Sequence, residues 1–116
     1  MQTDWSEDIV IENLSDEPSF SEDLSTILDR VAHGGKGVPH VVLNMAAVTY
    51  LNSSNLAQLV KLRNALLDKS KTLKLCSLCD EVESLLKVTG LNKILRSAPD
   101  PLTALAGIQI ETGGVK

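Results

Sequence analysis

The sequence is poor in aromatic residues and cysteines, and it has no long apolar run. One Trp, one Tyr and one Phe among 116 residues leave a core of aliphatic side chains, which argues against nucleic-acid binding by base stacking. The two cysteines do not have the spacing of a disulfide framework, and the chain has no recognisable export signal. Both observations predict a reducing, cytoplasmic setting. Since no apolar run approaches the roughly 18 residues of a membrane-spanning helix, we expect no membrane insertion.

Basic residues are absent from the beginning of the chain. Eight of the 15 acidic residues fall within residues 1–23, whereas all 11 Lys and Arg residues lie at or after Arg30. With a net charge of −4, the chain has no excess of basic residues to bind a phosphate backbone, so we expect no direct nucleic-acid partner. We interpret residues 1–23 as an acidic N-terminal segment in contact with solvent. The alternative is a charged surface that steers a partner toward the protein.

The rest of the sequence alternates between short apolar runs and amphipathic stretches. This pattern predicts four strands and four helices. The strands are expected at residues 9–11, 41–43, 73–76 and 94–95, and the helices at about 19–32, 56–67, 80–88 and 101–105. The apolar residues of the second helix lie on or near one face: Leu56, Leu59, Val60, Leu66 and Leu67. Strands that alternate with helices predict an α/β fold with a mostly parallel sheet of about four strands, flanked by about four helices. We expect a single domain over residues 1–116, with a core at about 8–106 and flexible ends.

Four small polar residues stand between the second strand and the helix at 56–67: Asn52, Ser53, Ser54 and Asn55. Side chains of these types cap helix N-termini, so one interpretation gives them a purely structural role. Paired hydroxyls at a helix N-terminus are also well placed to receive a phosphate or to contact a partner. The four residues alone leave both interpretations open.

The same stretch, in this order of elements, resembles the STAS domain of anti-sigma factor antagonists and sulphate transporters. The hallmark of that family is Asp-Ser-Ser-Gly or Asp-Ser-Thr-Gly after a buried strand. Residues 82–94 (Val-Glu-Ser-Leu-Leu-Lys-Val-Thr-Gly-Leu-Asn-Lys-Ile) resemble the third helix, Gly-Leu turn and last strand of the family. The resemblance covers about residues 8–106, with Asn52 in place of the family's Asp, Asn55 in place of its Gly, and room for one initial strand where the family has a hairpin.

The resemblance implies a small bacterial anti-sigma factor antagonist that is not an enzyme and needs no cofactor or metal. Its partners would be an anti-sigma factor of the serine kinase type and a phosphatase, and a homodimer is compatible with it. Ser54 would be the phosphorylated residue, with Ser53 as the second candidate. Asn52, Ser53, Ser54, Asn55 and Gln58 would contact the partner. The close alternative uses this surface without phosphorylation, in a stress-signalling scaffold or as an accessory subunit of a transporter ATPase.

Three further motifs have structural interpretations that we prefer. Cys76-Ser77-Leu78-Cys79 has the C-x-x-C spacing of a thiol oxidoreductase, a distant alternative, but it lacks the usual surroundings of that motif. We expect both thiols to be buried or half-buried. His33 and His40 have no ligands at metal-site spacing, and Gly34–Gly37 lacks the spacing of a phosphate-binding loop, so it is expected to end a helix.

Overall fold

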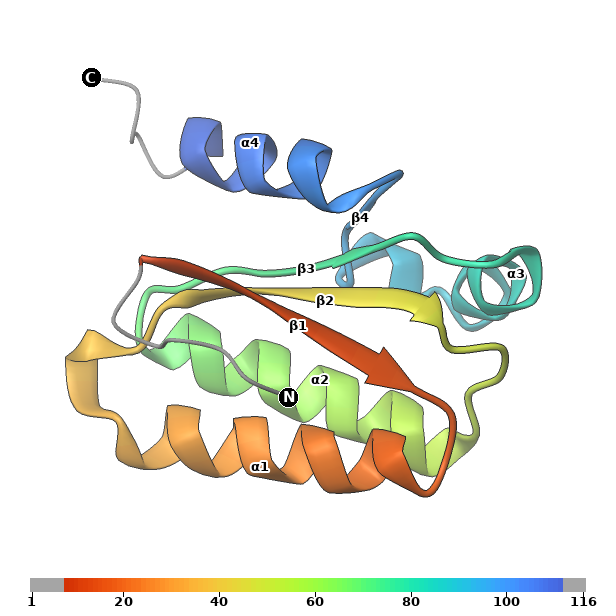
Figure 1. Cartoon of the computed structure of the whole chain (residues 1–116), viewed down its shortest axis with the longest axis horizontal. Helices are drawn as coiled ribbons and strands as arrows, with labels where there is room; N and C mark the ends of the chain where they lie inside the picture. The colour runs from red at the N-terminus through yellow and green to blue at the C-terminus, as the bar shows by residue number, and fades with distance from the viewer. Residues whose placement is uncertain (1–7, 112–116) are drawn as a thin grey trace.

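Four parallel strands form one sheet in the computed structural model, which describes residues 8–111. The strands lie side by side in chain order, and the register pairs Ile9 with His40, Val41 with Leu73, and Leu75 with Ser97. They are β1 (Ile9–Ser15), β2 (His40–Ala47), β3 (Leu73–Cys76) and β4 (Ser97–Ala98). All of their carboxyl ends therefore lie at the same edge of the sheet (Figure 1).

Four α-helices surround this sheet. They are α1 (Ser19–His33), α2 (Ser53–Asp68), α3 (Asp80–Thr89) and α4 (Pro101–Glu111), with short 3₁₀ turns at Gly35–Gly37 and Leu91–Lys93. Helices α1 and α2 cover one face of the sheet, α4 lies on the opposite face, and α3 lies beyond the carboxyl end of β2 (Figure 1). The α/β fold of four parallel strands and four helices is confirmed.

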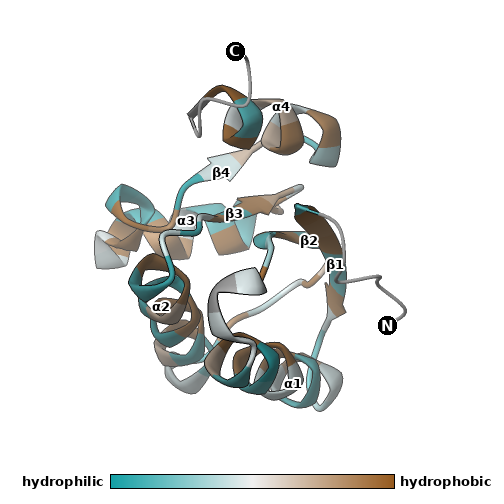
Figure 2. Cartoon of the chain, turned by 90° about the vertical axis from the view of Figure 1, so that its left-hand side faces the viewer, coloured by the Kyte–Doolittle hydropathy of each residue, from teal (hydrophilic) through white to brown (hydrophobic). Residues whose placement is uncertain are grey.

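The alternation of strand side chains divides the core into two unequal parts. The larger part lies mainly between the sheet and helices α1 and α2, which Figure 2 shows on the same side of the sheet. Its members include Val10, Leu14, Val41, Leu43, Leu75, Phe20, Leu24, Ile27, Leu59, Leu62 and Leu66. The smaller part lies under α4 and consists of Val42, Cys76, Ala104 and Ile108. Each fully buried Leu contributes about 1.5–3 kcal/mol relative to an exposed one, so most of the stability comes from the α1–α2 side.

The ends of two helices follow from their glycines. Gly90 has φ +78° at the C-cap of α3, a conformation that glycine adopts without steric cost. A Cβ on Gly34 would lie 2.4 Å from a Val38 side-chain carbon and 2.6 Å from the Arg30 carbonyl oxygen. The predicted helix stop at Gly34 is confirmed, and the close packing leaves no room for a side chain at this position.

Two predictions from the sequence are wrong. The last strand is Ser97–Ala98 and not Ile94–Leu95, because the chain continues in a helical turn in which the Leu95 N–H donates to the Leu91 carbonyl at 2.7 Å. Leu95 is buried nonetheless, at 2% exposure. Leu67, which the apolar pattern placed near the buried face of its helix, is 50% exposed.

Candidate functional site

Loops from three βα connections meet near the start of α2. The β1–α1, β2–α2 and β3–α3 connections all follow carboxyl ends of parallel strands (Figure 1). In open α/β sheets this edge is where ligands and partners most often bind. The four polar residues Asn52–Asn55 belong to the β2–α2 connection and the first turn of α2.

The first turn of α2 is closed by a reciprocal pair of hydrogen bonds. The Asn55 N–H donates to Asn52 Oδ1 at 2.8 Å, and the Asn52 N–H donates to Asn55 Oδ1 at 3.0 Å. Asn52 has the extended backbone expected of an N-cap residue, with φ −97° and ψ 176°. Two of the N–H groups that a helix start leaves without partners are thus satisfied by side chains of this turn.

Ser53 and Ser54 occupy the two positions between these asparagines. Both side chains are exposed, and within the described chain neither the hydroxyl nor the backbone N–H of either residue makes a hydrogen bond. The capping box therefore leaves two hydroxyls and two N–H groups facing solvent at the positive end of the helix dipole. An added phosphate at this point would find free donors close by.

The side chain of Asn55 is not on the surface, although the sequence suggested a partner contact. It is 1% exposed, and its Nδ2 donates to Glu17 Oε2 at 2.8 Å. Glu17 also accepts the Ser21 N–H at 2.9 Å and the Ser21 hydroxyl. The Ser21 hydroxyl, followed by the Asn55 amide, holds the pKa of the Glu17 carboxyl below its usual value.

Gln58 is half-buried and faces α1. Gln58 Oε1 lies 3.3 Å from the Ser21 hydroxyl oxygen, and Gln58 Nε2 donates to the Ser21 carbonyl at 3.5 Å. Asn55 and Gln58 together therefore join the start of α2 to the start of α1. Of the five predicted contact residues, Ser53 and Ser54 are exposed and Asn52 is half-buried.

Sequence reasoning missed three residues beside this turn. Asp16 accepts the Thr49 N–H at 2.8 Å and the Thr49 hydroxyl at 2.6 Å, and these bonds, the hydroxyl first, lower the pKa of Asp16. Glu17 bonds Asn55, as described above, and Tyr50 is 68% exposed. Both acids directly follow β1, so the rule that parallel carboxyl ends share an edge could have placed them here.

The two cysteines do not form a reactive pair. Cys76 is completely buried in β3, and burial raises the pKa of its thiol, the opposite of what a nucleophilic thiol requires. Cys79 is half-buried, and its thiol lies 3.6 Å from the Val48 carbonyl oxygen. Both are free thiols, as predicted for structural cysteines.

The two histidines make local structural contacts. Nδ1 of His33 lies 2.9 Å from the Asp29 carbonyl oxygen in the last turn of α1. Nδ1 of His40 accepts the Thr72 N–H at 3.0 Å, which ties β2 to the start of β3. Desolvation, followed by the charge of Lys71, lowers the pKa of His40.

The described residues include neither a metal site nor a membrane-spanning helix. No group of three or more His, Cys, Asp or Glu side chains among them could hold a metal ion. Within residues 8–111 no helix is long and apolar enough to cross a membrane.

Comparison with known proteins gives one family and a consistent set of structures. The family model of the STAS domain matches residues 10–104. A candidate anti-sigma factor antagonist from Thermotoga maritima is 17% identical, with 93% of each chain covered and a TM-score of 0.77. A serine-to-glutamate variant of RsbS from Moorella thermoacetica is 13% identical, with 97% of this chain and 99% of that chain covered and a TM-score of 0.75.

The Bacillus cell fate determinant SpoIIAA, in its phosphorylated form, is also similar. It is 14% identical, with 92% of this chain and 97% of that chain covered, and the TM-score is 0.67. At these identities the likeness establishes the fold. The comparison with curated protein sequences gave no match.

Proposed function

The chain belongs to the STAS domain family, and from that premise we propose that it is an anti-sigma factor antagonist. In this proposal it binds a kinase-type anti-sigma factor in the cytoplasm and thereby releases a sigma factor. The chain itself is not a catalyst. It is the substrate of the kinase, which phosphorylates Ser54, and of a phosphatase, which removes the phosphate.

One observation carries the proposal: two adjacent serine hydroxyls are exposed and unbonded at a helix start whose cap is already complete. Because neither hydroxyl is needed for capping, modification of Ser54 costs the fold no hydrogen bond. A phosphate adds about −1.5 to −2 charges, and the helix dipole favours this charge by about 0.3–1 kcal/mol. The effect of phosphorylation therefore falls on the partner contact.

The contact surface in this proposal consists of Ser53, Ser54 and Tyr50, with Asn52 at its edge. Tyr50 is 68% exposed, and exposed tyrosines are typical anchors of protein interfaces. Charge placed beside such an anchor repels an acidic partner surface or adds a desolvation cost to binding. Phosphorylated protein is thus expected to leave the complex.

A second candidate function uses the same surface without phosphorylation, as a scaffold subunit or an accessory subunit of a transporter ATPase. The position of Glu17 favours it. This carboxylate, whose pKa is lowered, bonds the side chain of Asn55, the residue after Ser54. A negative charge so close to the phosphorylation site opposes the addition of a phosphate.

The test is to incubate the purified chain with ATP and each kinase-type anti-sigma factor of the source organism, and to locate any phosphate by mass spectrometry. We expect phosphate on Ser54, none on Ser54→Ala, and binding weakened about a hundredfold or more by Ser54→Asp. Glu17→Gln should accept phosphate faster than wild type. A kinase that binds the chain but modifies neither Ser53 nor Ser54 would favour the second candidate.

A further inference from the structure

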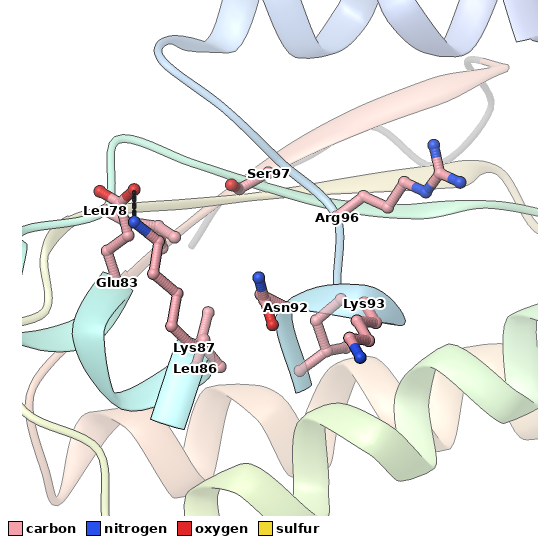
Figure 3. Close-up of a pocket in the computed structure, with 9 residues that line it drawn as sticks. Leu78, Glu83, Leu86, Lys87, Asn92, Lys93, Arg96 and Ser97 are labelled. Carbon is pink, nitrogen blue, oxygen red and sulfur yellow. Dashed lines mark ion pairs between the residues drawn. The ribbon is translucent and has the colours of Figure 1, made fainter. Parts of the chain in front are cut away.

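Two pockets lie side by side along the β3–β4 side of the molecule. The larger, of about 490 Å³, is lined by residues of α3, the 3₁₀ turn and the segment before β4 (Figure 3). The smaller, of about 390 Å³, is lined by Arg63, Leu67, Thr72, Leu73, Ile94 and Arg96. We call the smaller one the arginine pocket; Arg96 lines both.

The charges of the larger pocket are already partly compensated. Nζ of Lys87 lies 3.5 Å from a carboxylate oxygen of Glu83, and Figure 3 shows the two side chains turned toward each other. In the same view the Arg96 guanidinium extends away from Lys87 and Asn92. The uncompensated charge of Arg96 therefore lies away from that ion pair.

The arginine pocket has two cations and no acidic residue in its lining. Arg63 donates to the neighbouring Asn64 Oδ1 at 3.1 Å, and within the described chain Arg96 has neither an ion pair nor a side-chain hydrogen bond. The Thr72 hydroxyl also has no partner there, since the bond of Thr72 to His40 uses its backbone N–H. Two guanidinium groups and one hydroxyl are thus available to an incoming anion.

Apolar side chains complete the pocket beside these donors. Leu73 is 6% exposed and Ile94 is half-buried, and Leu67 is half exposed on α2. A volume of about 390 Å³ lies within the range of small-molecule sites, which combine apolar walls with a few polar groups. The pocket suits a ligand that has an anionic head and a small apolar body.

We propose that the arginine pocket binds a phosphate monoester of a small apolar compound. The phosphate lies between Arg63 and Arg96, with the Thr72 hydroxyl as a further donor, and the apolar part rests on Leu67, Leu73 and Ile94. Two arginines match the charge of about −1.5 to −2 on a phosphate monoester better than the single charge of a carboxylate. Guanidinium groups also form paired hydrogen bonds with phosphate oxygens.

This site is independent of the proposed phosphorylation site. Arg63 follows Ser54 by nine residues on the same helix, which places their Cα atoms roughly 14 Å apart at 1.5 Å per residue. No residue of the arginine pocket belongs to the first turn of α2. Binding here can therefore be tested with Ser54→Ala protein, and its failure leaves the proposed function untouched.

The experiment titrates the ¹⁵N-labelled full chain with phenyl phosphate, inorganic phosphate and phenol, and follows the backbone amide resonances. Phenyl phosphate is expected to shift the resonances of Leu73, Ile94 and Arg96 in a saturable way, and to bind more tightly than the other two probes. Arg63→Gln and Arg96→Gln should each weaken it about tenfold or more, because each removes a charge-assisted hydrogen bond.

Lys61→Gln is the matched control. Lys61 is an exposed cation on the same helix and lines neither pocket, so its loss should leave the affinity within about twofold. The amide spectrum and thermal midpoint of each variant report whether it is folded. Equal affinity for phenol or inorganic phosphate, or binding that survives both arginine substitutions, would overturn the proposal.

Discussion

The polar side chains near the two ends of α2 differ in how far other side chains satisfy their hydrogen bonds. At the N-terminal end, α1 and the β1–α1 loop provide hydrogen-bond partners for Asn55 and Gln58, whereas the hydroxyls of Ser53 and Ser54 have none in the part of the chain that the structure describes. Toward the C-terminal end, Arg63 lines a pocket with Arg96, whose side chain has no partner among residues 8–111. Groups that the fold already satisfies hold the structure together, whereas the unsatisfied groups at both ends are the ones available to a partner or ligand.

The packing of the C-terminal end can be tested with two adjacent leucines. Leu66 is completely buried and Leu67 is 50% exposed. We expect Leu66→Ala to lower the free energy of unfolding by about 2–5 kcal/mol, because it leaves a cavity in the larger core. Leu67→Ala should cost about 0.5 kcal/mol or less. Urea denaturation measures both, and similar losses would contradict the packing described for this end.

The rigidity of the N-terminal end depends on the capping box. Asn55→Ala removes the acceptor of the Asn52 N–H and the donor to Glu17. We expect a loss of about 2 kcal/mol in the free energy of unfolding, the upper range for a cap substitution. Ser53→Ala is the control in the same turn and should stay within about 0.5 kcal/mol. Equal effects in thermal or urea denaturation would show that the hydroxyls also support the fold.

The acidic groups beside the N-terminal end predict a pH dependence. Since the pKa values of Glu17 and Asp16 are lowered from ordinary values of 4.5 and 3.8, the folded protein favours their ionised forms. Their contribution to stability is complete above those ordinary values and is lost as the pH falls through the lowered pKa values. In circular dichroism melts, the thermal midpoint should fall less between pH 5 and 2.5 for the double variant Asp16→Asn/Glu17→Gln than for wild type. Glu81→Gln, at an exposed carboxylate without a hydrogen bond in the described chain, should follow wild type.

A smaller pH effect is expected near the other end, at His40. Its pKa is lowered from 6.5, and its Nδ1 accepts the Thr72 N–H, so the folded protein favours the neutral ring. The contribution of neutral His40 to the stability of the fold is complete above pH 6.5, and it is lost as the pH falls through the lowered pKa. His40→Asn, which keeps an acceptor but cannot be protonated, should reduce the fall in thermal midpoint between pH 7.5 and 5.5. His33→Asn, at an exposed histidine of α1, should not reduce it.

Sequence periodicity predicted the order of the helices and strands because each long element has its own apolar pattern. The apolar pattern placed the start of α2 three residues late, at Leu56 and not at Ser53, but the capping role considered for the Asn and Ser residues before it is confirmed for Asn52, because such caps are local bonds. It failed at β4, where two residues form a strand only because Leu75 and Ser77 donate backbone bonds to this segment. No apolar alternation marks such a short strand.

The candidate site was predictable only in part. The serine pair is visible in the sequence, but the burial of Asn55 depends on its bonds to Glu17 and Ser21, which lie more than 30 residues earlier in the chain. The arginine pocket was not predicted, because Arg63 on α2 and Arg96 before β4 come to line one pocket only in the folded chain. Contacts of this kind come from the tertiary fold, and local pattern carries no signal for them.

The strand order has a consequence for how the protein folds during synthesis. Each strand lies beside the one that precedes it in the chain, so every new βα unit can add to a sheet edge that already exists. Assembly can therefore begin before translation ends, although each parallel pairing must close a whole helical crossover, as between Ile9 and His40, which slows folding. The brief β4 and α4 join last, and until they do, Val42 and Cys76 stay open to solvent on the face that α4 will cover.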